Sequence, residues 1–193
     1  MSGRIVVLVS GTGSNMMALA RACDAGELPA RVEAVVGDRA CEGLSLAARA
    51  GIATEVCAPR DYTDRSQWNA ALRDRVAKYR PDLVVSAGFM RILDPGFVDA
   101  FYGRLVNLHP SLLPSFPGAH AVRDALAAGV KVTGTTVHLV DREVDHGPIL
   151  FQEPVRVRAG DTEASLHERI KAVEHVLLVR ACRSLLEAGQ PKA

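Results

Sequence analysis

Two polar side chains stand two residues apart in the segment Asn107-Leu108-His109-Pro110-Ser111-Leu112-Leu113-Pro114. The apolar residues before them indicate a strand. Side chains alternate between the two faces of a strand, so Asn107 and His109 should point the same way. An amide can stabilise a developing oxyanion, and a neutral imidazole can move a proton at physiological pH. The pair suits an acyl-type transfer, while a strand end whose polar residues only cap a loop is the simpler alternative.

A carboxylate could join this pair from a later part of the chain. Asp145 lies in the polar segment 141–148, between two segments rich in β-branched residues. Such a segment is usually a solvated loop. If the sheet places it beside His109, its charge would favour the protonated imidazole. Among the other histidines, His138 is flanked by apolar residues and is interpreted as a satisfied residue of the sheet.

A glycine-rich turn follows the first apolar run and leads into a helical pattern, with the sequence Ser10-Gly11-Thr12-Gly13-Ser14-Asn15. Glycines at such a turn let the backbone approach a phosphate, and the N–H groups of the helix start face the anion. A dinucleotide interpretation would use Asp38 as the ribose-binding acid, but Met16 replaces the third small residue of that fingerprint. A monophosphate suits the turn better, and a tight turn without a ligand stays open.

A second candidate binding segment, Ala87-Gly88-Phe89-Met90-Arg91-Ile92-Leu93, follows another short apolar run. Ligands in open α/β sheets bind beyond the carboxyl ends of the strands. An apolar loop there could accept a flat heteroaromatic group, with backbone amides binding its edge. Taken alone, such a loop is more often simple core packing.

The pattern of elements predicts the fold. We expect strands at 4–9, 32–37, 53–57, 83–86 and 104–107, and helices near 15–25, 42–50 and 64–79. Runs that are apolar on both faces, such as residues 5–9, are typical of parallel strands covered by helices on each side. Further strands are expected at 132–140 and 149–157, followed by an amphipathic helix over 163–187 and a frayed tail over 189–193. The predicted class is α/β, a doubly wound, mostly parallel Rossmann-like sheet with helices on both faces and an antiparallel strand addition near the C-terminus.

Length and composition exclude several functions. The chain has 193 residues, a net charge of +1 and 4 cysteines. That length suits one well-buried core, so we expect one domain over 1–193. The balanced charge gives no basic surface for nucleic acid, and no apolar run approaches the roughly 20 residues of a membrane span. The cysteines are scattered, which predicts reduced thiols and no metal site. The missing membrane span and an N-terminal apolar run too short for a signal peptide predict a soluble cytoplasmic protein.

Five segments together resemble the phosphoribosylglycinamide formyltransferase family of folate-dependent enzymes. They are the three quoted above with Gly134-Thr135-Thr136-Val137-His138 and Asp145-His146-Gly147-Pro148-Ile149, and the resemblance runs from Ile5 to about Leu186. The segment around Asn107 and His109 belongs to folate formyltransferases in general. The turn at residues 10–15, together with the chain length, points to the glycinamide ribonucleotide branch.

The resemblance implies transfer of the formyl group of 10-formyltetrahydrofolate, as co-substrate, to the amine of glycinamide ribonucleotide in purine biosynthesis. It implies no metal and a catalytic trio of Asn107, His109 and Asp145. By similarity, the nucleotide would contact Gly13, Ser14, Asn15, Asn107, Lys171 and Glu174. The folate would contact Arg65, Phe89, Met90, Arg91, Ile92, Leu93, Asp141, Arg142, Glu143, Val144 and Asp145.

The same resemblance suggests a division of labour, with a nucleotide-phosphate half over 1–100 and a catalytic and folate-binding half over 101–188. It implies small-molecule substrates, no nucleic-acid or membrane partner, and a monomer or homodimer. His146 departs from the family pattern, which usually has glycine or another small residue there. A formyltetrahydrofolate hydrolase and a non-catalytic nucleotide- or folate-binding module are the alternatives.

Overall fold

The structure is a computed structural model that describes residues 2–189, so residues 190–193 of the expected frayed tail lie outside it. Its strands are β1 (Gly3–Val9), β2 (Ala30–Gly37), β3 (Ala53–Val56), β4 (Leu83–Ser86), β5 (Leu105–His109), β6 (Val132–Leu139) and β7 (Ile149–Arg156). They form one seven-stranded sheet in the order β3-β2-β1-β4-β5-β6-β7. The first five strands pair in parallel, whereas β5–β6 and β6–β7 are antiparallel. The predicted fold class is confirmed.

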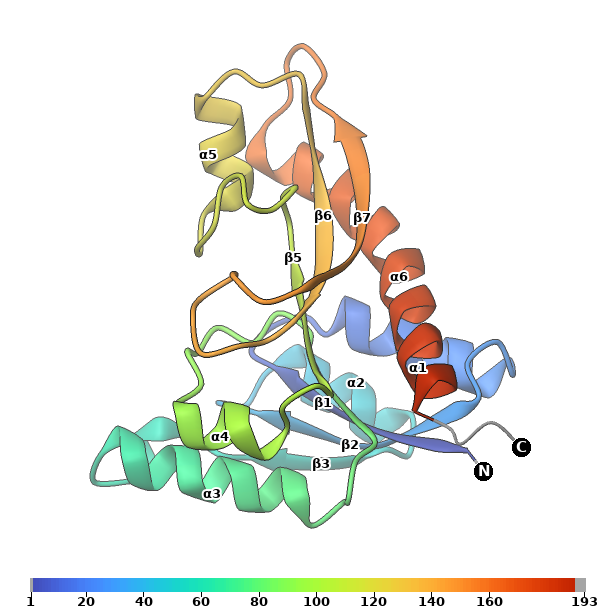
Figure 1. Cartoon of the computed structure of the whole chain (residues 1–193), viewed down its shortest axis with the longest axis vertical. Coiled ribbons are helices and arrows are strands. Elements are labelled where there is room, and N and C mark those ends of the chain that lie inside the picture. Colours follow the sequence, from blue (N-terminus) through green and yellow to red (C-terminus); the bar gives the residue numbers. More distant parts are fainter. Residues whose placement is uncertain (1, 190–193) are drawn as a thin grey trace.

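Helices cover both faces of this sheet (Figure 1). They are α1 (Ser14–Asp24), α2 (Glu42–Arg49), α3 (Arg65–Ala77), α4 (Pro95–Ala100), α5 (Ala121–Ala127) and α6 (Glu163–Ala188), with a short 3₁₀ turn at Pro59–Asp61. Helices α1, α2 and α6 contribute to the core on one face, and α3 and α4 to the core on the other. Helix α5 packs beside the first half of α6.

The central strand β1 shows why the sequence folds in this way. All of its residues from Ile5 to Val9 are fully buried. Ile5 and Val7 belong to the core under α1 and α6, whereas Val6 and Leu8 belong to the core under α3. Each such side chain contributes about 1.5–3 kcal/mol by leaving water. A run that is apolar on both faces therefore becomes an interior parallel strand.

Two short helices were not expected from the sequence. Helix α4 had a usable signal, because Asp94 accepts a hydrogen bond from the Phe97 amide at 2.8 Å and Pro95 occupies the first helical position. Helix α5 follows His120, which makes no side-chain cap. In addition, β5 extends to His109, beyond the expected end at 107, because it pairs with β6 through Thr136.

The topology brings several loops to one edge of the sheet. The carboxyl ends of β2, β1 and β4 are neighbours, so the segments that begin at Asp38, Ser10 and Ala87 lie side by side. Strand β5 comes next and ends at His109. Within residues 2–189, no helix is both long enough and apolar enough to cross a membrane.

Close approach of two chain segments requires glycine at position 134 of β6. A Cβ there would collide with the Glu153 carbonyl oxygen of β7 and would lie 2.6 Å from Leu112 Cδ2. We expect Gly134→Ala to lower the free energy of unfolding by about 1–3 kcal/mol, measured by urea denaturation. Gly96→Ala is the matched control, since its Cβ would meet only Asp94 Oδ1 at an ordinary 3.5 Å. An equal effect of the two substitutions would contradict this account.

Candidate active site

The structure brings Asn107, His109 and Asp145 together on one face of β5. One carboxylate oxygen of Asp145 lies 3.4 Å from His109 Nδ1, and the other lies 3.5 Å from Asn107 Nδ2. The backbone amide of Gly118 donates to the same carboxylate at 2.8 Å. The side chains of His109 and Asp145 are only 5% and 10% exposed. A nearly buried carboxylate thus contacts the imidazole and the amide at once.

The second nitrogen of His109 is also occupied. Its Nε2 lies 2.8 Å from the carbonyl oxygen of Phe116, which can only accept a hydrogen bond. Nε2 must therefore carry a hydrogen in this arrangement. The other nitrogen faces the Asp145 carboxylate, so a doubly protonated ring would donate to both neighbours.

Two of the residues around the imidazole have an unusual backbone. Phe116 has a φ of 54° and Asp145 a φ of 55°, in the left-handed region that non-glycine residues seldom adopt. Such a conformation costs on the order of 1–3 kcal/mol and is found most often where a site needs it. Here the two strained residues supply the two oxygen acceptors of the His109 ring. The strain serves to fix that ring.

His138 also belongs to this cluster, although the sequence predicted only a satisfied residue of the sheet. In the β5–β6 pair His138 stands directly opposite Asn107. Its Nδ1 lies 2.9 Å from the Leu139 carbonyl oxygen and therefore carries the hydrogen, so Nε2 accepts from Asn107 Nδ2 at 3.1 Å. Nε2 is also 3.8 Å from Asp145. Burial is the main cause that lowers the pKa of His138, and it outweighs the attraction of Leu139 and Asp145.

The glycine-rich turn joins β1 to α1. Gly13 has a φ of 77°, and a Cβ there would lie 2.5 Å from the Gly43 Cα of α2. No side chain caps helix α1, so no capping side chain blocks the N–H groups of its first turn. The side-chain amide of Asn15 donates to the carboxylate of Glu174 on α6 at 2.9 Å. Burial is the main cause that raises the pKa of Glu174, so its carboxyl group is easier to protonate than usual.

The other expected nucleotide contact, Lys171, lies on α6 one turn before Glu174 and pairs with Glu168 at 2.7 Å. The turn, α1 and α6 therefore bring Asn15, Lys171 and Glu174 to one region. Glu174 also faces Thr135 of β6, whose hydroxyl donates to the His109 carbonyl oxygen at 3.2 Å, so this group adjoins the His109 strand.

The expected folate segments form two loops with exposed apolar side chains. Met90 and Ile92 follow β4 and are 68% and 64% exposed, and Val144 of the loop before β7 is 56% exposed. Arg65 of α3 donates to the Ile92 carbonyl oxygen at 2.6 Å and so holds the first loop. Phe89, in contrast, is buried and stacks on Trp68, so its ring belongs to the core.

The second loop is held at several points. Arg142 donates to Asp99 of α4 at 2.7 Å, and Asp141 accepts from the Glu143 amide at 2.9 Å. His146, the departure from the family pattern, lies 3.0 Å from the same Asp141. This contact with the Asp141 carboxylate raises the pKa of the exposed His146.

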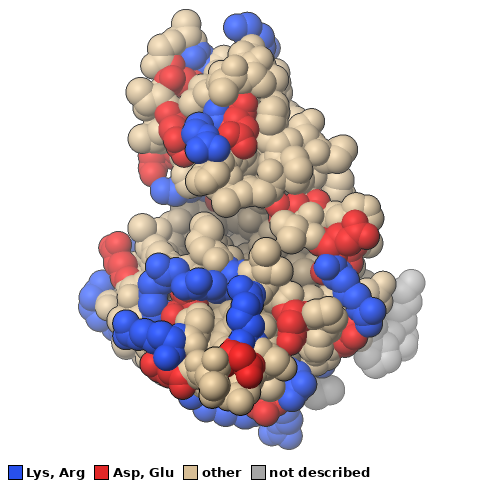
Figure 2. Space-filling model, turned by 90° about the vertical axis from the view of Figure 1, so that its left-hand side faces the viewer, with Lys and Arg blue, Asp and Glu red and all other residues tan. Residues whose placement is uncertain are grey.

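Figure 2 views the molecule from the side of α4, α5 and this loop. It shows a recess across the middle of the face, with Lys and Arg side chains gathered below it.

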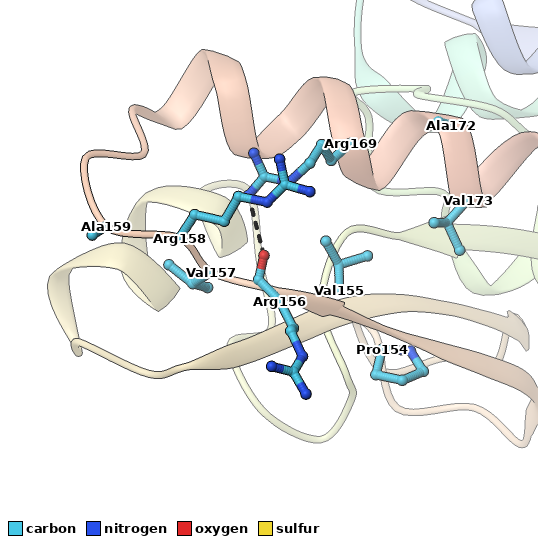
Figure 3. Close-up of a pocket in the computed structure, with 9 residues that line it drawn as sticks. All are labelled: Pro154, Val155, Arg156, Val157, Arg158, Ala159, Arg169, Ala172 and Val173. Carbon is cyan, nitrogen blue, oxygen red and sulfur yellow. Dashed lines mark hydrogen bonds between the residues drawn. The ribbon is translucent and has the colours of Figure 1, made fainter.

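A separate cavity of about 620 Å³ lies between the end of β7 and α6, where Arg169 donates to the Arg156 carbonyl oxygen (Figure 3). None of the expected site residues lines that cavity. Among residues 2–189, no cluster of three or more His, Cys, Asp or Glu side chains could hold a metal ion.

Comparisons with known proteins cover nearly the whole chain. The model of the formyl transferase family matches residues 3–182. The chain is 54% identical over 186 residues to phosphoribosylglycinamide formyltransferase of Mycobacterium tuberculosis. The match covers 96% of this chain and 86% of the relative. The corresponding Escherichia coli protein is 44% identical and covers 90% of this chain and 82% of the relative. The chain belongs to the formyl transferase family. The resemblance inferred from the sequence is confirmed.

Solved structures of this family have the same fold. Glycinamide ribonucleotide transformylase 1 from Symbiobacterium toebii superimposes with a TM-score of 0.95 at 44% identity. The match covers 100% of this chain and 91% of that one. The family fold therefore extends over the whole sheet, including the antiparallel pair β6–β7 that carries His138.

His138 and His146 should titrate at different pH values. Burial disfavours the charged form of His138, whereas the Asp141 carboxylate favours the charged form of exposed His146. In an NMR titration of the ring protons, we expect the His138 midpoint below the usual value of about 6.5 and the His146 midpoint above it. The reverse order would contradict the assigned hydrogen bonds.

Proposed function

We propose that the protein transfers the formyl group of 10-formyltetrahydrofolate to the amine of phosphoribosylglycinamide, a step of purine biosynthesis. The observation that carries this proposal is the contact of Asp145 with both His109 and Asn107 beside two loops that bear exposed apolar residues. The relatives named above are enzymes of this kind. The family identity gives the reaction class, and the cluster supplies groups suited to it.

The polar groups suit attack of an amine on a formyl carbon. The transition state places negative charge on the formyl oxygen, and preorganised donors in a water-poor site stabilise such charge. Asn107 would be one donor. Its contact with Asp145 is 3.5 Å, too long for a strong hydrogen bond, so that N–H stays available to the oxyanion while the other N–H bonds to His138.

His109 would supply the second donor and move protons through Nδ1, because its Nε2 hydrogen is already bonded to the Phe116 carbonyl oxygen. The Phe116 contact fixes the ring, and Nδ1 lies 3.4 Å from Asp145, too long for a strong hydrogen bond, so Nδ1 stays available to the reacting atoms. The carboxylate stabilises the charged ring while the reaction places a proton on it. The residues thus orient the reacting atoms and carry protons, with no covalent bond from the enzyme to the formyl group.

The two substrates would occupy opposite sides of this cluster. The turn at Gly13, Ser14 and Asn15 would bind the phosphate, while Lys171 and Glu174 would contact the ribose region. Buried and readily protonated, Glu174 can accept or donate hydrogen bonds to hydroxyl groups.

The loops at 89–93 and 141–145 would hold the folate. They fit a flat ring because Met90, Ile92 and Val144 present apolar surface that is otherwise left in water. Phe89 would contribute only through its backbone, because its ring is in the core. Arg65, Arg91, Leu93, Asp141, Arg142, Glu143 and Asp145 complete the proposed contacts.

In this scheme the chain acts as one domain, 1–193. Residues 1–100 bind the nucleotide phosphate, and 101–188 supply the trio and part of the folate site. We propose that the enzyme is cytoplasmic and acts as a monomer or a homodimer.

An assay of formyl loss separates the candidate functions. The protein is mixed with a formyl-folate analogue, and deformylation is followed with and without glycinamide ribonucleotide. We expect turnover only when the amine is present. Turnover without the amine would identify a hydrolase, and no turnover in either case would identify a binding module, so either result contradicts the proposal.

The same assay tests the role of the imidazole. His109→Asn should abolish turnover while glycinamide ribonucleotide still binds, because none of its expected contacts is removed. His167→Asn on α6 is the matched control and should keep the normal rate. A His109 variant with a near-normal rate would remove the histidine from the mechanism.

A further inference from the structure

Asp38 is a carboxylate that the proposed reaction does not use. It follows β2 at the same edge of the sheet as the turn after β1 and the loop after β4. Its side chain is fully buried. The dinucleotide interpretation would make it free to bind a ribose. A buried carboxylate, however, needs partners within the protein.

Two arginines supply those partners. Arg39 donates to both oxygens of Asp38, at 3.1 and 2.9 Å, and Arg91 Nε donates to one of them at 2.6 Å. Burial opposes ionisation of Asp38, but the hydrogen bonds of Arg39, Arg91 and Ser10 outweigh it and hold the pKa below its usual value. Asp38 is therefore charged at neutral pH and has no oxygen left for a ribose in this arrangement.

The same contacts fix the loop that follows β4. The Ser10 hydroxyl faces Asp38, whose pKa it helps to lower, and accepts from the Met90 amide at 2.9 Å. The Ser10 amide also donates to the Gly88 carbonyl oxygen at 3.2 Å. Asp38 thus reaches Arg91 directly and Met90 through Ser10. Arg91 bonds to Asp38 through Nε, so both of its terminal nitrogens stay available to bind a ligand. The Arg91 side chain is about one third exposed.

We propose that Asp38 is a positioning residue that sets the folate-side loop through Arg91 and Ser10. This inference rests on the proposed function, because the folate of that reaction is the ligand of the loop. One carboxylate between two guanidinium groups leaves one positive charge in excess at the loop. The excess charge suits the carboxylate-bearing end of a folate, and Asp38 fixes where that charge points.

The test compares the affinities for the two substrates. Asp38→Asn keeps the shape of the side chain but removes its charge. We expect the dissociation constant of a non-reactive formyl-folate analogue to rise about tenfold, with that of glycinamide ribonucleotide changed less than twofold. Asp161→Asn is the matched control, because Asp161 also pairs with an arginine, Arg169, but lies at the start of α6. It should leave both constants unchanged.

A double-mutant cycle tests whether Asp38 acts through Arg91. In an Arg91→Ala background, Asp38→Asn should add little further loss of analogue affinity. Additive losses would overturn the proposal. An unchanged affinity, or equal losses for both ligands, would also overturn it, since equal losses indicate only general destabilisation.

Amide hydrogen exchange gives a readout that does not depend on the reaction. We expect the Met90 amide to exchange faster in Asp38→Asn, because the Ser10 hydroxyl loses its charged neighbour and Arg91 its ion pair. An unchanged Met90 exchange rate would overturn the positioning role even if transfer is confirmed. A wild-type protein that binds no folate analogue would instead overturn the proposed function, while Met90 exchange would still report on the loop.

Discussion

The site depends on one nearly buried carboxylate. Asp145 comes from a loop, yet it contacts His109, Asn107 and the Gly118 amide together. A charge so removed from water is stable only with such partners, and removing one of them leaves the others uncompensated. The strained backbone at Asp145 shows that the surrounding structure holds this position against a local cost. The carboxylate therefore organises the groups around it.

Strand topology explains how residues so far apart in the chain can meet. Parallel pairing brings the ends of β2, β1 and β4 to one edge, where the phosphate turn and the Asp38–Arg91 contact lie. The antiparallel strand β6 then returns along β5 and places His138 opposite Asn107. The loop between β6 and β7 folds back over this pair and carries Asp145. The change from parallel to antiparallel pairing thus builds the candidate site.

The sequence predicted much that depends on local pattern, although the capping signal of α4 was missed. The buried strands follow from apolar runs, and the common direction of Asn107 and His109 follows from their spacing of two. His138 could not be assigned in this way, because its contact depends on the register between two strands. The role of Asp38 was likewise hidden, since Arg91 lies 53 residues further along. Helix α5 was missed because no capping side chain marks its start.

The most direct test of the central claim is the single-turnover rate of formyl transfer in Asp145→Asn, measured beside a control, Asp124→Asn, at a side chain of α5 that is 43% exposed. The amide keeps the shape of the side chain but cannot stabilise a charged His109. The account predicts a rate reduced on the order of 10²- to 10⁴-fold in Asp145→Asn, with both substrates still bound, and no change in the control. A rate within a few fold of the wild type would contradict it.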